Sequence, residues 1–232
     1  MNLSLSYKEK QSSSAILLCL IFYIILPFVL VRFFPDIANF LRRYALLSMM
    51  LPGLLIYGIV SLYAGNFLVK KEDFQNVPFG RITVFSLIMI PVNAIGTFGW
   101  MILLKVLKLQ FDTDVPIENF IRNCNTEELI FSGIFICILT PLIEESIFRR
   151  VIYEGLKERC PQVFSITLAS LLFGVLHGIL FQLFSLFLLG IYFQILYCRD
   201  NKLGASVYAH FFNNTFAFCM LLIFKAAGVQ NF

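Results

Sequence analysis

The chain has 232 residues, of which 59% are hydrophobic and only 14% are charged, whereas a soluble domain carries about 25% charged residues. The formal net charge of +4 is spread along the chain without a Lys/Arg run, which argues against nucleic acid as a partner. The 6 cysteines are scattered without a CxxC pair, which argues against a zinc knuckle or a disulfide framework. We therefore predict an all-α fold, a polytopic bundle of transmembrane helices surrounded by membrane lipids.

Apolar stretches of about 20 residues predict the helices that span the membrane. In chain order these stretches are 14–34, 43–68, 81–108, 127–148, 163–179, 181–199 and 203–225. The first follows Lys8 and Lys10 but is longer than the apolar core of a signal peptide, so we expect it to be a retained helix. Pro91 within the third stretch leaves open a further helix, so the expected number is about seven, between six and eight.

The polar segment 111–126 divides the chain into two parts. We interpret 1–125 as N-terminal transmembrane helices of unassigned role and 126–232 as the helical core that carries the ionisable groups of interest. Asn125, followed by Glu127 and Glu128, predicts a helix start at this boundary. The distribution of Lys and Arg between the loops favours a cytoplasmic N-terminus.

Two adjacent glutamates, Glu144 and Glu145, interrupt a stretch that otherwise has the composition of a bilayer-spanning helix. A carboxylate at membrane depth costs about 2.5–3.5 kcal/mol, so the pair requires an explanation. Arg149 lies four residues after Glu145 and shares its helix face, which favours a structural ion pair. Glu144 is rotated by about 100° from Glu145. No Lys or Arg lies four residues after Glu144, so it lacks a cation on its own helix face. Glu144 is therefore the candidate to accept or shuttle a proton.

Both histidines of the chain lie in later apolar stretches, and each has a neighbour one helical turn away. His177 follows Phe173, and Asn214 follows His210. Each pair alone is typical of hydrogen bonding between helices. Together with Glu144, these side chains provide bases and hydrogen-bond donors that can activate water and hold an oxyanion. The same atoms are also suitable zinc ligands, although the HExxH motif is absent.

Four other polar residues are weaker candidates for the functional site. Ser132 and Ser146 lie near the glutamates but lack the strand–turn–helix context of a serine nucleophile. Tyr192 and Gln194 are candidates to line a cavity, and packing is the favoured interpretation of both.

The motifs EExxxR at 144–149, FxxxH at 173–177 and HxxxN at 210–214 resemble, in this order, those of the CPBP family. This family of intramembrane endopeptidases includes CAAX proteases and bacteriocin-processing proteins and is also called the Abi family. The resemblance covers residues 126–225. It implies hydrolysis of peptide bonds in membrane-associated peptides or protein tails that are apolar or lipidated. It also suggests a multi-pass protein of a bacterial cell membrane.

The resemblance assigns a role to each motif residue. It implies that Glu144 and His177 activate the attacking water, and that His210 and Asn214 stabilise the oxyanion. It implies that Glu145 supports the site and is a further catalytic candidate. Two motif residues are expected to give structural support, and these are Arg149 and Phe173.

The resemblance leaves the cofactor open, because both metalloprotease and metal-free glutamate catalysis are argued for this family. We favour a site without a tightly bound metal, since the motifs provide no evident partners to orient the histidines. If zinc is present, the candidate ligands are Glu144, His177 and His210.

Two other functions remain open on the sequence. The first is a non-catalytic immunity or scaffold protein of the same family, in which the motif helices form a packing core. The second is a small transporter that relays protons through Glu144 and the histidines. No inverted repeat is evident, which argues against the transporter.

Overall fold

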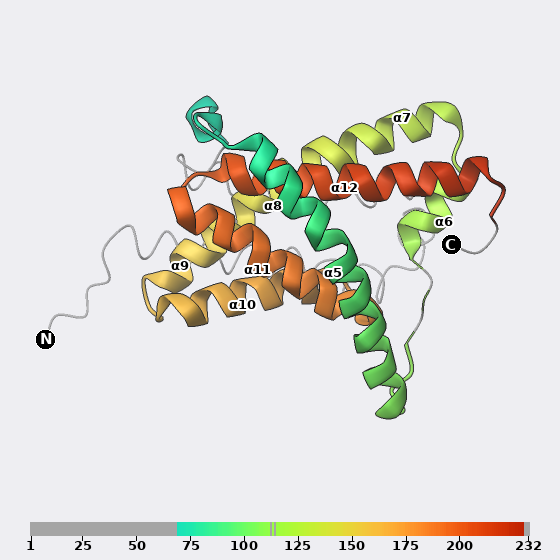
Figure 1. Ribbon diagram of the computed structural model, residues 1–232, viewed down its shortest axis with the longest axis horizontal. Helices are drawn as coiled ribbons and strands as arrows, with labels where there is room; N and C mark the ends of the chain where they lie inside the picture. The colour runs from blue at the N-terminus through green and yellow to red at the C-terminus, as the bar shows by residue number, and fades with distance from the viewer. Residues whose placement is uncertain (1–68, 112, 114, 230–232) are drawn as a thin grey trace, which may run out of the picture.

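The computed structural model describes residues 69–229 apart from positions 112 and 114, and it is helical throughout this part of the chain (Figure 1). The prediction of an all-α membrane bundle is thereby confirmed. The helices predicted at 14–34 and 43–68 lie outside the described residues.

The described part begins with a short 3-10 helix, a long helix and a short helix, which are η2 (Lys71–Phe74), α5 (Phe79–Val106) and α6 (Pro116–Asn123). One continuous helical rod follows, composed of α7 (Thr126–Ile134), η3 (Phe135–Leu139), α8 (Thr140–Glu145), η4 (Ser146–Tyr153) and α9 (Glu154–Lys157). The remaining elements are α10 (Gln162–Leu176), η5 (Leu180–Gln182), α11 (Leu183–Asp200) and α12 (Leu203–Ala226).

Four helical stretches are long and apolar enough to cross a membrane, namely Phe79–Val106, Thr126–Lys157, Leu180–Asp200 and Leu203–Ala226. They agree with four of the five spans predicted within the described part. The fifth, α10, has only 15 residues. At about 1.5 Å per residue it is shorter than the hydrocarbon core of about 30 Å. It ends early because the chain turns at Gly178, which has a φ of 69° that favours glycine.

The helix that carries the two glutamates extends beyond its predicted end at 148. It starts at Thr126, where Asn125 and Glu128 form the expected capping box, with both side chain–backbone distances at 2.9 Å. It continues to Lys157 because the arginines after residue 148 are paired with carboxylates. Two π-helical segments, η3 and η4, lie on either side of α8. Such segments are rare and occur frequently at functional sites.

The further helix considered for 81–108 is not found in the described residues, because α5 is continuous through Pro91. The proline side chain is exposed on this helix. The helix therefore continues although the proline nitrogen donates no hydrogen bond.

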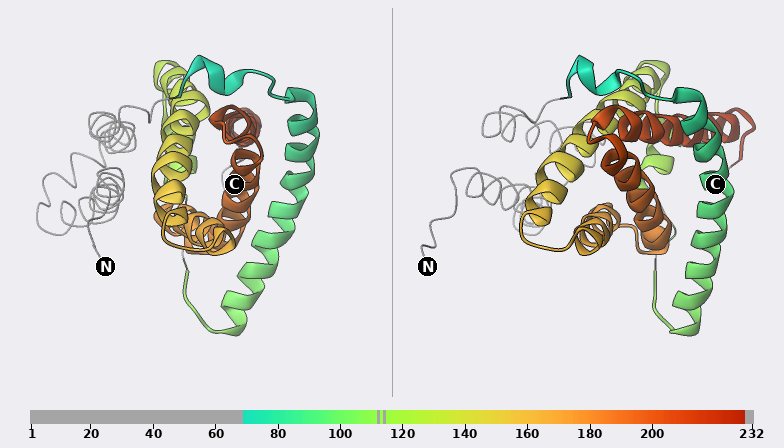
Figure 2. Two further views of the ribbon diagram at one scale, coloured as in Figure 1. Left: turned by 90° about the vertical axis from the view of Figure 1, so that its left-hand side faces the viewer. Right: turned by 60° about the vertical axis from the view of Figure 1, so that its left-hand side comes forward.

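The helices form a layered bundle in which α11 and α12 lie between α5 and the 126–157 rod (Figure 2). α10 packs along α11. Their backbones come close, since a Cβ atom at Gly190 would lie 3.0 Å from the Cα atom of Ser170. The core between these helices is rich in aromatic side chains, including Phe148, Phe173 and Phe193, each 1% exposed. Glu145, Arg149 and His210 lie in this apolar core.

One end of the bundle is held together by Asp73, which is buried. Its Oδ1 atom accepts from Arg150 Nη2 at 2.5 Å and from the backbone amide of Leu203 at 3.3 Å. Gly204 follows at the start of α12, where a Cβ atom would meet the backbone of Asp73. Segment 69–78 is thereby fixed to both the rod and α12.

The opposite end of the bundle is held by Lys225, near the end of α12. Its Nζ atom donates to the carbonyls of Ile121 and Cys124, at 2.7 Å in each case. These carbonyls belong to the last turn of α6 and to the residue that follows it. The ammonium group therefore satisfies carbonyls that the end of a helix leaves free.

Candidate active site

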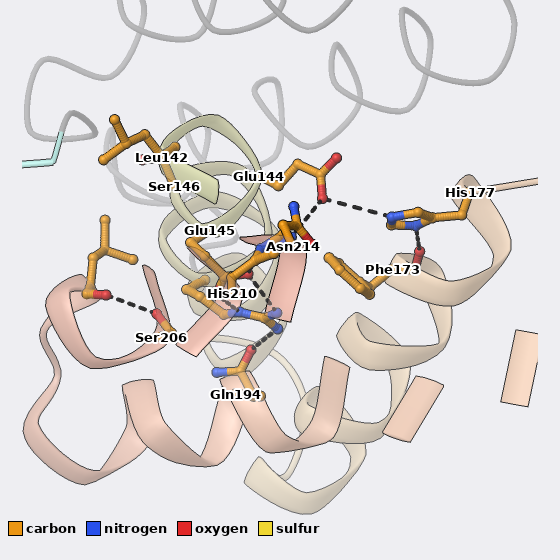
Figure 3. A network of polar contacts seen from close by, with 12 residues as sticks. Leu142, Glu144, Glu145, Ser146, Phe173, His177, Gln194, Ser206, His210 and Asn214 are labelled. Atoms are coloured by element: carbon orange, nitrogen blue, oxygen red, sulfur yellow. Dashed lines mark hydrogen bonds and ion pairs between the residues drawn. The ribbon is translucent and has the colours of Figure 1, made fainter. Parts of the chain in front are cut away.

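The two glutamates of α8 face different partners, as their rotation about the helix axis predicted. Glu145 is fully buried, whereas the side chain of Glu144 is 11% exposed. Figure 3 shows Glu144 directed towards His177 and Glu145 directed towards His210. The pair therefore separates into an inner and an outer carboxylate.

The inner carboxylate, Glu145, forms the ion pair with Arg149 that the four-residue spacing predicted. Arg149 Nε lies 2.8 Å from Oε2, and Arg149 Nη2 lies 3.3 Å from Oε1. Both side chains are 0% exposed. A buried pair is tolerated when its geometry is good and its remaining donors are satisfied. The two-point contact meets the first condition.

Glu145 also binds His210, a contact that the sequence did not predict. His210 Nδ1 lies 3.0 Å from Glu145 Oε1. An ionised carboxylate only accepts hydrogen bonds, so Nδ1 carries the proton and donates. This contact fixes the ring with its Nε2 atom towards the other glutamate, and Nε2 lies 3.9 Å from Glu144 Oε2.

The second histidine is oriented in the same way by a backbone carbonyl. His177 is the residue that ends α10, and its Nδ1 atom lies 2.7 Å from the carbonyl oxygen of Phe173. Nδ1 is therefore the donor. His177 Nε2 lies 3.9 Å from Glu144 Oε2. One carboxylate oxygen thus faces the Nε2 atoms of both histidines, at distances that one water molecule can bridge.

Phe173 is the packing centre of the site. Its ring lies 4.7 Å from that of His177 and 5.8 Å from that of His210, between ring centroids. The guanidinium of Arg149 lies 5.6 Å from the Phe173 ring centroid. Phe193 stacks on the ring of His210, with 4.9 Å between the two ring centroids. Aromatic side chains thus hold both imidazoles and exclude water from the inner carboxylate.

Asn214 is fixed by the first π-helical segment. Its Nδ2 atom donates to the carbonyl of Ile136 at 3.0 Å. An amide nitrogen carries two hydrogens, so one remains for another acceptor. Asn214 lies one turn after His210 on α12, which places it on the same side of that helix.

The serines near the glutamates make only local contacts. Ser132 Oγ donates to the carbonyl of Leu129 at 2.9 Å, and Ser146 Oγ donates to that of Leu142 at 2.6 Å. These bonds to a preceding turn are typical of serine within a helix. They agree with the sequence interpretation that neither serine is a nucleophile.

Gln194 binds Arg149, a contact that the sequence did not predict, because packing was the favoured interpretation of this residue. Its Oε1 atom accepts from Arg149 Nη1 at 3.0 Å. Tyr192, interpreted in the same way, instead bonds to Ser86 of α5, with 3.1 Å between the two hydroxyl oxygens. Gln194 belongs to none of the three motifs and lies 45 residues from Arg149, so the only sequence feature that could have indicated this contact is an amide within an apolar helix.

The spacing of the Glu144, His177 and His210 atoms determines whether they fit a zinc ion. Ligands at about 2.0–2.1 Å in tetrahedral geometry lie about 3.3 Å from one another. Glu144 Oε2 lies 3.9 Å from the Nε2 atoms of His177 and His210, so these two distances are longer than those between ligands of a tetrahedral zinc ion. Among the described residues, no group of three His, Cys, Asp or Glu side chains is close enough to hold a metal ion.

The sequence also predicted that no partners orient the histidines, and this prediction is wrong. The structure provides such a partner for each Nδ1 atom, namely the carbonyl of Phe173 for His177 and the carboxylate of Glu145 for His210. Partners of this kind orient histidines in metal sites and also in metal-free acid–base sites.

The fold and the site together define a multi-pass helical membrane protein with a buried carboxylate–histidine centre. Residues 123–216 match the family model of the type II CAAX prenyl endopeptidase Rce1-like proteins. This range contains all three motifs. The match agrees with the CPBP, or CAAX-protease, family that the motifs predicted for this part of the chain.

A curated relative agrees with this assignment. The Bacillus subtilis (strain 168) protein named "Putative membrane peptidase YdiL" is 34% identical over 85 residues. The match covers 37% of this chain and 35% of that protein, so it spans about a third of either. No solved structure matches the chain.

Proposed function

We propose that this chain is an intramembrane endopeptidase in which Glu144 activates the attacking water. One observation carries the proposal: Glu144 Oε2 lies 3.9 Å from the Nε2 atoms of both His177 and His210 inside an apolar bundle. Each Nδ1 atom is a donor to another group, so each Nε2 atom in a neutral ring has a free lone pair. Three acceptors therefore face one another, and a water molecule can donate its two hydrogens to two of them at a time.

The proposed hydrolysis starts with proton transfer from this water to the Glu144 carboxylate. The water oxygen then forms a bond to the carbonyl carbon of the scissile peptide, and the C=O π electrons move to the oxygen. When the tetrahedral intermediate breaks down, the C–N bond breaks and the amine nitrogen needs a proton. His177 relays the proton from Glu144 to that nitrogen. No step runs through a metal ion.

His210 and Asn214 are proposed to stabilise the oxyanion. Asn214 has one amide hydrogen in addition to the one donated to Ile136. In the resting site the His210 ring is neutral and Nε2 is an acceptor; it can donate to the oxyanion only after the ring has taken up a second proton from solvent, since Nδ1 donates to Glu145. Glu145 then serves as the acceptor that holds the charged ring. Donors of this kind contribute about 2.7–4 kcal/mol each to transition-state stabilisation in known oxyanion holes.

The substrate is proposed to be a membrane-associated peptide or protein tail with an apolar or lipidated portion. The side chains of Glu144 and His177 are 11% and 28% exposed, whereas Glu145 is fully buried. A substrate therefore reaches the site on the side of Glu144 and His177. The family model named for prenyl endopeptidases supports a lipid-modified tail. We also propose a bacterial cell membrane, by analogy with the Bacillus subtilis relative, and a cytoplasmic N-terminus, on the basis of the loop charges.

The test compares purified wild type with Glu144→Gln on a library of peptides that carry an apolar or lipid anchor. Glu144→Gln keeps the size of the side chain but removes the base, so we expect cleavage to fall by about 10²-fold or more. Glu127→Gln is the matched control, because Glu127 is exposed on the same helix and should retain wild-type activity.

Two outcomes would contradict the proposal. Equal cleavage by wild type and Glu144→Gln would assign the chemistry to another residue. If neither protein cleaves any peptide, the result would favour a non-catalytic immunity or scaffold protein.

A further inference from the structure

Gln194 is a fully buried amide on α11, a helix that is apolar enough to cross the membrane. An amide in such a helix requires hydrogen-bond partners, because no bulk water is available to it. The structure supplies one partner at each end of the amide. Gln194 is not part of the three motifs, although it lies in the matched range.

The neighbours fix the orientation of this amide. Arg149 has donors only, so the atom that faces its Nη1 at 3.0 Å must be the amide oxygen. The amide nitrogen then donates to Cys198 Sγ at 3.4 Å. Cys198 in turn donates to the hydroxyl of Tyr153 at 3.2 Å. Two contacts therefore hold the amide in place between the rod and its own helix.

Gln194 completes the coordination of the buried guanidinium. Arg149 uses Nε and Nη2 for Glu145, and it uses Nη1 for Gln194. A planar guanidinium held at three nitrogens cannot rotate about its long axis. Phe173 covers one face of the group, with 5.6 Å from the guanidinium carbon to the ring centroid.

The same carboxylate oxygen connects this arrangement to the histidine. Glu145 Oε1 accepts from Arg149 Nη2 at 3.3 Å and from His210 Nδ1 at 3.0 Å. A movement of the guanidinium therefore moves the atom that fixes the imidazole, and Figure 3 shows this continuous series of contacts. We propose that Gln194 is a positioning residue, which acts through Arg149 and Glu145 to keep His210 protonated on Nδ1 with Nε2 directed at Glu144.

This inference concerns how the proposed protease works and therefore rests on the proposed function, but one test is independent of activity. The chain has only 2 histidines. Full-length protein labelled with ¹⁵N-histidine therefore gives two sets of ring signals, which report the protonated nitrogen of each ring. His177→Gln removes one set and assigns the other to His210.

The decisive variant is Gln194→Met, which preserves volume but has no amide oxygen. We expect the His210 signals to change from a single Nδ1-protonated form to an exchanging mixture of tautomers, while the His177 signals stay the same. We also expect kcat to fall by about tenfold, the scale for partners that orient functional histidines. KM should stay within about twofold, since Gln194 does not touch substrate.

Gln194→Glu is the rescue variant, because it restores an oxygen acceptor for Arg149. We expect it to return the His210 signals and kcat towards the wild-type values. Gln75→Met is the control for the substitution itself, because Gln75 is exposed after η2, and it should change neither quantity.

Gln194→Asn covers the case in which Gln194→Met does not fold. It stays polar but withdraws the oxygen from Arg149, so the same change in the His210 signals is expected. Unchanged His210 signals in whichever variant folds would overturn the proposal. If wild type cleaves no peptide, the proposed function fails, whereas the signals still test the positioning role of Gln194.

Discussion

Glu145 and His210 are 65 residues apart in sequence and are joined by a 3.0 Å hydrogen bond between Oε1 and Nδ1. The bond connects the helix of the glutamate pair to α12. It gives Glu145 two roles, since the same carboxylate balances the charge of Arg149. Arg149, Glu145 and His210 therefore form one connected network. A change at any of them alters both the charge balance of the buried ion pair and the orientation of the His210 ring.

Removing the arginine should destabilise the protein. Arg149→Ala leaves the fully buried carboxylate of Glu145 without its cation, which costs about 3–5 kcal/mol of unfolding free energy. Unfolding of the purified protein in detergent measures this loss. Arg199→Ala is the control, because Arg199 is 52% exposed and pairs with an exposed aspartate, so little change is expected. An Arg149→Ala variant as stable as the wild type would contradict this expectation.

Gly204 should not tolerate a methyl group. A Cβ atom there meets the backbone of Asp73, which a flexible side chain cannot relieve. Gly204→Ala is expected to lower the unfolding free energy by about 1–3 kcal/mol. Gly99→Ala is the matched control within a helix, because nothing lies within 4 Å of its Cβ position. There alanine should be neutral or stabilising, by up to about 1 kcal/mol. Equal stability of the two variants would contradict the close approach.

The single tryptophan should hold the loop that follows His177. Trp100 Nε1 donates to the carbonyl of Leu180 at 2.8 Å, and its ring stacks on Phe184. Trp100→Phe keeps an aromatic ring but removes the donor, at a cost of about 1 kcal/mol. Amide hydrogen exchange in 177–182 should then be about fivefold faster, while exchange in α12 stays unchanged. Equal exchange rates in this loop would show that the hydrogen bond does not hold it.

A membrane anchor should improve the substrate. The site lies within an apolar bundle and opens on the side of Glu144 and His177. Attaching an acyl or prenyl chain to a cleavable peptide is expected to lower the apparent KM, because the chain concentrates the peptide in the membrane. Cleavage assays of the same peptide with and without the anchor, in detergent and in vesicles, measure this effect. Equal KM values in vesicles would contradict it.

Chelation tests the expectation about the metal. The three candidate ligand atoms are 3.9 Å apart in the two pairs that include Glu144 Oε2. Prolonged treatment with a strong zinc chelator should therefore leave cleavage largely intact. Loss of activity that zinc restores would make His177 and His210 ligands, and the distances to Glu144 would have to shorten on binding.

The contacts that could be predicted from the sequence are mostly local. The spacing of four residues predicts Glu145–Arg149, and the residues around Asn125 predict the start of the rod. Both depend on helix geometry alone. The apolar stretches likewise predict where the helices lie, because the bilayer fixes the length of a spanning segment.

The contacts that could not be predicted require knowledge of which helix faces which. Glu145–His210 and Arg149–Gln194 each join two helices, and nothing in the local pattern of either residue identifies its partner. The continuation of the rod to Lys157 has the same cause, since Arg150 finds its carboxylate at Asp73, which is 77 residues away. Local periodicity therefore places the glutamates on a helix but does not determine how their charges are balanced.

The bond between Asp73 and Arg150 bears on how far this chain can be shortened. A fragment that began at residue 123 would keep the whole family match and all three motifs. It would nevertheless lose the carboxylate that binds Arg150 and accepts from the first amide of α12. Such a fragment would leave the guanidinium of Arg150 without this carboxylate, in the helix that carries the two glutamates. We therefore expect a stable fragment to start before Lys70, whose backbone amide also binds Asp73.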